Sequence, residues 1–287
     1  MMQDFICDLP IIGDFMAQRP KVAVVRLSGV LADHGMRKGG LSYAKYADLI
    51  EQAFAVKGVR EVALVINSPG GAPAQASLLS GVIRQCASEK KMPVTAFVED
   101  VAASGGYWLA CAADKIYVQP SSLVGSIGVI ASGFGFEDFI KKHDVHRRVY
   151  TAGHSKSMLD PFLPEKREDV ERVKALQSEI HAQFITWVKD RRGQRIKGSD
   201  GDLFEGQIWT GAGAINTGLA DALGDVRGVY HEKYGHDVRL MEFAPERPFL
   251  QSLFSAKGPN AKGPGDDFVA QALGVLEERS EWSRFGL

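Results

Sequence analysis

The stretch Glu61–Gly71, EVALVINSPGG, decides the fold class of this 287-residue chain. Its apolar part, Glu61–Ile66, predicts a strand buried on both faces, and Asn67–Gly71 predicts a tight turn at its carboxyl end. The next residues, Ala72–Glu89, have apolar side chains at helical spacing and predict a helix. A strand, a turn and a helix in this order make the first half of a βαβ unit, which leads to a parallel sheet.

The same alternation continues on both sides of this unit. Further strands are expected at Lys21–Leu31, Met92–Val98, Lys115–Val118 and Val145–Tyr150, and a further helix at Ser42–Ala55. These elements predict an α/β fold of repeated βαβ units, with a largely parallel sheet flanked by helices. The strand-to-helix turns of such a sheet gather at one edge, where open α/β folds place their sites.

The C-terminal half predicts one long helix and a tail. Glu165–Arg192 carries apolar residues at steps of three or four, which form a single stripe that packs on a domain or on a partner subunit. The Gly/Pro-rich segment Gly258–Gly265 predicts a flexible linker. We therefore expect an N-terminal arm at 1–20, a single domain at 21–250, and a linker with a C-terminal tail at 251–287.

The composition excludes several function classes. A formal net charge of −1 provides no global field that would attract nucleic acid. Cys7, Cys86 and Cys111 are odd in number and lack metal-ligand spacing, which argues against a disulfide framework and a metal site. No apolar run reaches the ~20 residues of a membrane-spanning helix, and the N-terminus lacks the basic region of a signal peptide. We expect a cytoplasmic protein, with peripheral attachment to a membrane as the alternative.

The segment Asp100–Asp114, DVAASGGYWLACAAD, carries the candidate nucleophile. Ser104 follows a predicted strand and opens a run of small residues, which places its Oγ and the Gly105 N–H at a helix N-terminus. Backbone N–H groups at such a place stabilise an oxyanion beside a nucleophile. The alternative is that Ser104 is a plain helix cap, because serine is a good N-cap residue. The small and apolar neighbours Ala102, Ala103, Tyr107 and Leu109 suit small or apolar substrate side chains, or are simply core packing.

The turn Asn67–Gly71 is a candidate for the second oxyanion donor, from Gly70 or Gly71. Its backbone groups could also pair with an extended peptide as an added strand. The alternative is an ordinary Pro-Gly turn. A phosphate loop is excluded because the Gly-Lys-Ser/Thr ending is missing.

The candidate base is a lysine. No histidine lies in an arrangement like the G-x-S-x-G elbow, and His154 is the only histidine near a plausible site loop. The same loop, Tyr150–Asp160, carries Lys156, and a lysine acts as a base when burial lowers its pKa. The alternatives are an exposed surface lysine, His154 as the base, or Cys111 as a cysteine nucleophile.

The ordered set NSPGG, AASGGYWLACAADKIY, GSIGVI and a later loop lysine resembles the signal peptide peptidase family. Those enzymes are Ser-Lys serine peptidases of the Clp/crotonase-like fold. The similarity runs from about Lys21 to about Gly224 and includes IWTGAGAINTGLADALGD. This chain is similar to the short, single-module members, and we expect it to be without the N-terminal membrane anchor that many members carry.

The resemblance implies a role for each matched position. Ser104 would be the nucleophile, Lys156 the general base, and Ser126 the hydroxyl that orients the lysine amine. The implied oxyanion donors are Gly71, Gly105 and, as a close second to Gly71, Gly70. The implied substrate-binding residues are Asn67, Ser68, Pro69, Ala103 and Gly106. The chemistry would proceed through an acyl-enzyme and would need neither a metal nor an organic cofactor.

The resemblance also implies partners. The substrates would be peptides, such as signal-peptide remnants or other apolar peptides, and capsid maturation in a phage is a variant of the same chemistry. In the short relatives several subunits complete the site, so we expect a homo-oligomeric ring, an octamer or a tetramer, with no nucleic-acid partner. Two rival functions share the fold: a crotonase-type acyl-CoA enzyme, which needs no serine-lysine pair, and a non-catalytic scaffold, which is expected to lack one of the two residues.

Overall fold

The computed structural model describes residues 19–33, 40–153, 155–245, 282–283 and 285. The expected arm at 1–20 and the expected linker and tail at 251–287 fall almost wholly outside these residues. The domain boundaries at these positions therefore stay predictions.

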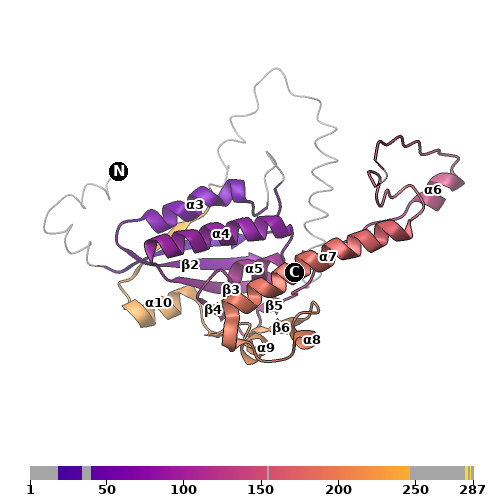
Figure 1. The fold of residues 1–287 in the computed structure, drawn as a ribbon. Helices are drawn as coiled ribbons and strands as arrows, with labels where there is room; N and C mark the ends of the chain where they lie inside the picture. The colour runs from indigo at the N-terminus through magenta and orange to yellow at the C-terminus, as the bar shows by residue number, and fades with distance from the viewer. Residues whose placement is uncertain (1–18, 34–39, 154, 246–281, 284, 286–287) are drawn as a thin grey trace, which may run out of the picture.

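An eight-stranded sheet forms the centre of the molecule (Figure 1). Its strands are β1 (Lys21–Ser28), β2 (Val59–Ser68), β3 (Val94–Ala103), β4 (Lys115–Val118), β5 (Leu123–Gly125), β6 (Ile208–Thr210), β7 (Ala222–Leu223) and β8 (Arg239–Phe243). The strand order is β6-β5-β3-β2-β1-β8, with β4 beside β3 and β7 beside β4. Every pairing is parallel except that of β5 with β6. The expected α/β fold with a largely parallel sheet is confirmed.

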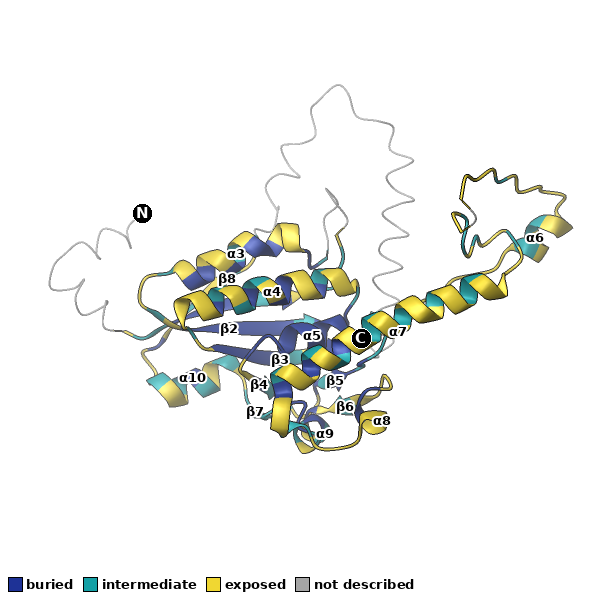
Figure 2. Ribbon diagram, viewed as in Figure 1, coloured by how far each residue is buried: buried dark blue, intermediate teal, exposed yellow. Residues whose placement is uncertain are grey.

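Helices cover the two faces of the sheet unequally. The helices are α3 (Tyr43–Ala55), α4 (Pro73–Lys90), α5 (Gly105–Ala110), α6 (Glu137–Lys142), α7 (Arg167–Arg192), α8 (Asp200–Leu203), α9 (Gly211–Asn216) and α10 (Val226–Tyr234), with a 3₁₀ turn at Gly193–Arg195. The larger core lies between the sheet and α3, α4 and α5, and a smaller core lies under α10 on the opposite face. Figure 2 shows the strands buried between these two layers. Burial on both faces explains the continuous apolar run of β2.

The expected long helix is present as α7, and only its C-terminal half packs on the domain. Trp108 of α5 stacks on Phe184, with ring centroids 4.9 Å apart, and its carbonyl accepts a hydrogen bond from Trp187 Nε1 at 3.0 Å. The outer half of α7 projects away from the sheet and leads back to α6 (Figure 1). The apolar stripe therefore continues beyond the surface that it covers within this chain.

One expected strand is wrong. Val145–Tyr150 has no regular secondary structure and no neighbouring strand, and five of its six residues are exposed. The segment, VHRRVY, has β-branched and aromatic residues at its ends, but a strand also needs a partner for its backbone N–H and C=O groups. This segment belongs to the projection at the outer end of α7, where the sheet does not reach.

Candidate functional site

Three parallel strands end side by side and bring the candidate motifs to one edge of the sheet. Ser68 of β2 pairs with Ala102 of β3, and Ala103 pairs with Gly125 of β5. The turns that follow these strands are therefore neighbours, although they are far apart in the sequence. This edge is the carboxyl edge of the sheet, where α/β folds place their sites.

Ser104 occupies a strained turn between β3 and α5. Its φ of 50° and ψ of −123° lie in a region that residues with a Cβ rarely adopt. Its backbone is fixed on both sides, because its N–H donates to Gly125 O at 2.8 Å and its carbonyl accepts from Tyr107 N at 2.9 Å and Trp108 N at 3.0 Å. Its side chain makes no capping hydrogen bond. The helix-cap alternative therefore fails for the hydroxyl, which lies half-buried at the sheet edge.

Gly70 has to be glycine because the turn packs directly against Ser104, the predicted nucleophile. Its φ is +109°, and a Cβ at this position would lie 2.7 Å from Ser104 Cβ and 2.9 Å from Ala103 O. Gly71 is restricted in the same way, because at its φ of +132° a Cβ would lie 2.3 Å from Leu31 O. The turn Asn67–Gly71 and the turn at Ser104 thus meet through bare backbone.

The backbone N–H groups where these two turns meet differ in whether they already donate a hydrogen bond. Gly70 N donates to Ser68 Oγ at 3.3 Å. Within the part of the chain that the structure describes, neither Gly71 N nor Gly105 N donates a hydrogen bond to a protein atom. Two unused donors next to Ser104 are what an oxyanion site requires.

Ser126 lies next to Ser104 because both residues follow directly after the paired residues Gly125 and Ala103. Its φ is 51°, and its N–H donates to Gln207 O at 2.6 Å. Ser126 is half-buried. The predicted nucleophile and the predicted orienting hydroxyl thus lie at the ends of neighbouring strands.

The structure does not bring Lys156 to this edge within one chain. The segment between α6 and α7, 143–166, lies beyond the outer end of α7, far from α5 (Figure 1). Lys156 is exposed, and its amine makes neither a hydrogen bond nor an ion pair with any described residue. His154, the alternative base, lies outside the described residues.

The predicted substrate-binding residues are mostly covered by protein. Ser68 and Ala103 are fully buried, and Pro69 and Gly106 are also buried. Gly106 is in tight contact with β2, because a Cβ on it would lie 2.3 Å from Ser68 O. Asn67 is half-buried and uses both polar atoms of its side chain within the chain. A substrate contact by these residues stays a prediction.

The apolar neighbours of Ser104 are core residues. Ala102, Ala103, Tyr107 and Leu109 are all buried, and Tyr107 OH donates to Leu219 O at 2.9 Å. The core-packing alternative therefore describes them. Cys111 is also fully buried, and burial raises the pKa of its thiol to about 12, so it is excluded as a nucleophile at neutral pH.

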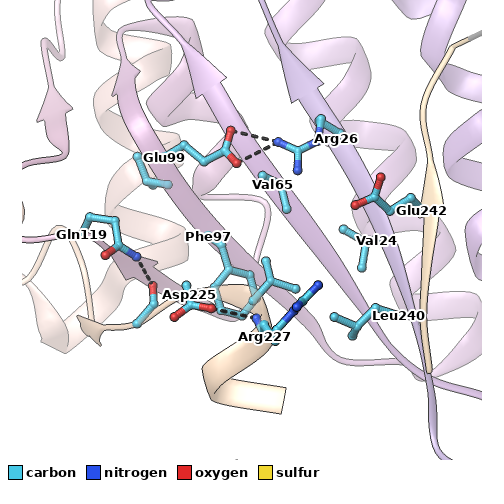
Figure 3. A pocket seen from close by; sticks show the side chains of 13 residues that line it. Val24, Arg26, Val65, Phe97, Glu99, Gln119, Asp225, Arg227, Leu240 and Glu242 are labelled. Carbon is cyan, nitrogen blue, oxygen red and sulfur yellow. Dashed lines mark hydrogen bonds and ion pairs between the residues drawn. The ribbon is translucent and has the colours of Figure 1, made fainter. Parts of the chain in front are cut away.

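A pocket of ≈ 250 Å³ lies on the opposite face of the sheet, under the N-terminus of α10 (Figure 3). Its apolar floor is formed by Val24, Val65 and Phe97, and its rim holds the ion pair of Arg26 with Glu99.

No group of three or more His, Cys, Asp or Glu side chains among the described residues could hold a metal ion. No described helix is long and apolar enough to cross a bilayer.

The chain is similar to several known proteins. The family model described as Peptidase family S49 matches residues 87–237, more than half of the chain. A protein of Brucella abortus (strain 2308) named Na(+)/H(+) antiporter NhaA is 47% identical, over 95% of this chain and 38% of that protein. A putative signal peptide peptidase SppA of Enterococcus faecium is 27% identical, over 72% of this chain and 61% of that protein. The chain thus spans less than two thirds of the length of either relative.

Among solved structures, the chain is similar to a membrane-bound stomatin-specific protease, with a TM-score of 0.50 and 14% identity. The similarity covers 79% of this chain and 99% of that chain. At this level of identity it shows a shared fold only.

Proposed function

The chain belongs to peptidase family S49, and on that premise we propose that it is a serine endopeptidase with Ser104 as the nucleophile. The observation that carries the proposal is the geometry at the sheet edge. A serine with a strained φ of 50° lies beside two backbone N–H groups that have no acceptor among the described residues. Strain at a nucleophile holds the hydroxyl in one fixed position, as in the sharp turns of other serine hydrolases.

The proposed reaction follows the acyl-enzyme route. Ser104 Oγ attacks the carbonyl carbon of the scissile peptide bond, and the base takes the hydroxyl proton. The carbonyl oxygen becomes an oxyanion, which accepts hydrogen bonds from Gly71 N and Gly105 N. Gly71 is favoured over Gly70 as a donor because the N–H of Gly70 is directed at Ser68 Oγ. The base then gives the proton to the leaving amine, and water hydrolyses the ester.

We assign the role of base to Lys156 of a neighbouring copy of this chain, oriented by Ser126. The support is that 143–166, which carries Lys156, lies at the far end of α7 and cannot serve Ser104 of its own chain in this arrangement (Figure 1). A projection of this kind reaches outward to a second molecule. Ser126 lies beside Ser104 at the end of β5, where a lysine amine that enters the site can meet its hydroxyl.

We use the name projection for residues 130–166 together with the outer half of α7. The surface of this projection supports contact with a second copy. Many of its apolar side chains are exposed, including Ile130, Phe134, Phe139, Val145 and Tyr150. A groove of ≈ 600 Å³ runs between this segment and the outer half of α7, lined in part by Phe134, Leu159, Val170 and Val173. A patch of this kind on a soluble monomer is unusual and marks an interface. We propose that the copies form a homo-oligomeric ring, with an octamer or a tetramer as the candidate sizes.

The proposed substrates are extended peptides with small or apolar residues, such as signal-peptide remnants. The relative in Enterococcus faecium is named a putative signal peptide peptidase, which supports this choice. The proposed location is cytoplasmic, with peripheral attachment to a membrane as the alternative.

The test is hydrolysis of fluorogenic casein and of an apolar peptide, together with labelling by a fluorophosphonate. The purified full chain should cleave and become labelled, and Ser104→Ala should do neither. Lys156→Ala should lose at least 10²-fold in rate, roughly the contribution of a general base, while it keeps its fold and assembly size. Absence of cleavage and labelling in a folded, assembled wild type would contradict the proposal and favour the scaffold function.

A further inference from the structure

Strand β3 contains an irregularity three residues before the nucleophile. Ile66 of β2 pairs with Val98, but Ser68 pairs with Ala102. The three residues 99–101 of β3 therefore lie opposite the single residue Asn67. Such a bulge bends the strand and re-aims the residues that follow it.

The bulge is also the point at which β3 changes its neighbour. Before it, Thr95–Phe97 pairs with Lys115–Tyr117 of β4. After it, Val101–Ala103 pairs with Leu123–Gly125 of β5. The direction in which β3 leaves the bulge thus decides where Ser104 lies relative to Ser126 and Gly71.

The side chain of Asn67 fills the gap on the β2 side of the bulge. Its Nδ2 donates to Asp100 Oδ2 at 2.8 Å, and its Oδ1 accepts from Val101 N at 3.2 Å. The backbone carbonyl of Asn67 is itself held by Gly29 N at 3.0 Å. One amide side chain thus replaces the backbone pairing that the bulge removes.

Ser122 holds the opposite side of the bulge. It is buried, and its hydroxyl donates to Glu99 O at 2.5 Å and accepts from Gln119 N at 2.8 Å. The Glu99 side chain is fixed in turn by Arg26 of β1, through contacts of 2.8 and 2.9 Å that Figure 3 shows across the face of β2. Strands β1, β2 and β5 and the turn before β5 therefore all contact residues 99–101.

We propose that Asn67 and Asp100 form a positioning pair that sets the location of Ser104 through the bulge. The pair joins the two motifs NSPGG and DVAASGG by a direct side-chain contact. Asn67 then acts on the rate of the chemical step, and not by contact with the substrate as its motif suggests. This inference rests on the proposed function of Ser104.

The pair can be tested by exchange of its two members. Asn67→Asp removes the donor and sets two carboxylates against each other, which repel. The exchange Asn67→Asp with Asp100→Asn restores the pattern, because Asn at position 100 donates to Asp at position 67, which still accepts from Val101 N. Asn216→Asp is the matched control, because Asn216 is exposed on α9 and makes no side-chain hydrogen bond with a described residue.

We expect Asn67→Asp to lower kcat and the rate of fluorophosphonate labelling by about 10- to 100-fold, as a misplacement near 1 Å does, with KM nearly unchanged. The exchange should recover both rates to within about threefold of wild type, since the coupling energy of a contact appears in a double-mutant cycle. A wild-type rate in Asn67→Asp, a rise in KM alone, or an exchange variant as slow as Asn67→Asp would each overturn the pair. A wild type that is never labelled would instead overturn the proposed function.

Discussion

At the scale of single residues, the site depends on two glycines that allow two turns to touch. The contact of Gly70 with Ser104 is possible only without a Cβ on Gly70. Any side chain there has to displace either Ser104 or the carbonyl of Ala103, which belongs to β3. Ser104 and its neighbouring turn therefore form one unit.

We expect Gly70→Ala to abolish activity and to destabilise the fold, because the new methyl group meets Ser104 Cβ at 2.7 Å at a φ of +109°. Strain of this kind costs about 1–3 kcal/mol. Gly81→Ala is the matched control, since a Cβ on this glycine of α4 has no heavy atom within 4 Å. Gly81→Ala should raise stability by about 0.5–1 kcal/mol and keep full activity. Chemical denaturation and peptide hydrolysis measure both, and an active Gly70→Ala would contradict the close approach.

The sequence predicts much of this site and misses part of it. The order of strand, turn and small-residue helix is sufficient to place Ser104 and Gly71 at one edge of the sheet, whereas Ser126 is expected there only from the family resemblance. The contact between Asn67 and Asp100 is not predicted, because it depends on a bulge, and a shift of pairing register leaves no periodic signal. The distance between Lys156 and Ser104 in one chain likewise cannot be predicted from the sequence, since it depends on the direction of α7.

At the scale of elements, α7 is fixed to the domain by a buried ion pair at its C-terminal end. Arg192 is 2% exposed, and its guanidinium donates to both carboxylate oxygens of Asp221 and to Gly218 O. Burial alone would raise the pKa of Asp221, but the hydrogen bonds and the charge of Arg192 outweigh it and leave that pKa below its usual value. A helix that projects a functional loop needs a firm base of this kind.

We expect Asp221→Asn to lower the free energy of unfolding by about 3 kcal/mol at pH 7, because it leaves the buried charge of Arg192 uncompensated. The folded pKa of Asp221 lies below the unfolded value of about 3.9, so its contribution is complete above about pH 4 and is lost as the pH falls further. The difference from wild type should therefore shrink below about pH 4. Asp144→Asn, which changes an exposed carboxylate, should cost less than about 1 kcal/mol. Urea titrations across this pH range measure both variants, and a pH-independent loss in Asp221→Asn would contradict the ion-pair account.

The elements show where sequence patterns are sufficient. The strands inside the sheet are long apolar runs. β2 covers the predicted strand Glu61–Ile66, while β3 (Val94–Ala103) runs five residues past the predicted strand Met92–Val98. Val145–Tyr150 has strand-like residues but no partner strand, and a pattern of single residues contains no information about partners. The apolar pattern of α7 correctly predicts a helix. Because the apolar stripe is continuous, it does not indicate that only one half of the helix packs on the domain.

At the scale of the whole molecule, the outer half of α7 and the segment before it project away from the sheet (Figure 1). The sheet edge with Ser104 and the segment that carries Lys156 lie at opposite ends of the outer half of α7 (Figure 1). The apolar surface between them has no cover within the described residues. Both features have one explanation if the projection of one copy contacts the next copy around a ring.

Two leucines with nearly equal exposure can test the proposed interface against the rest of the surface. Leu176 on the outer half of α7 is 49% exposed, and Leu78 on α4 is 48% exposed. We expect Leu176→Gln to reduce the assembly size in light scattering and to lower peptide turnover with it, because the interface loses about 1–3 kcal/mol of apolar burial. Leu78→Gln should change neither quantity. Equal effects of the two variants would contradict an interface on the projection.

Mixing of two inactive variants tests the proposal that Ser104 of one copy and Lys156 of another form the active site. Ser104→Ala and Lys156→Ala chains, each inactive alone, are unfolded, mixed in equal amounts and refolded together. A site is complete when one chain contributes an intact serine and the neighbouring chain contributes an intact lysine. Each condition is met with a probability of one half, so about a quarter of the sites are complete. Random mixing around a ring of heterologous contacts should thus restore about a quarter of the wild-type activity. Mixed assemblies that stay inactive would contradict a shared site.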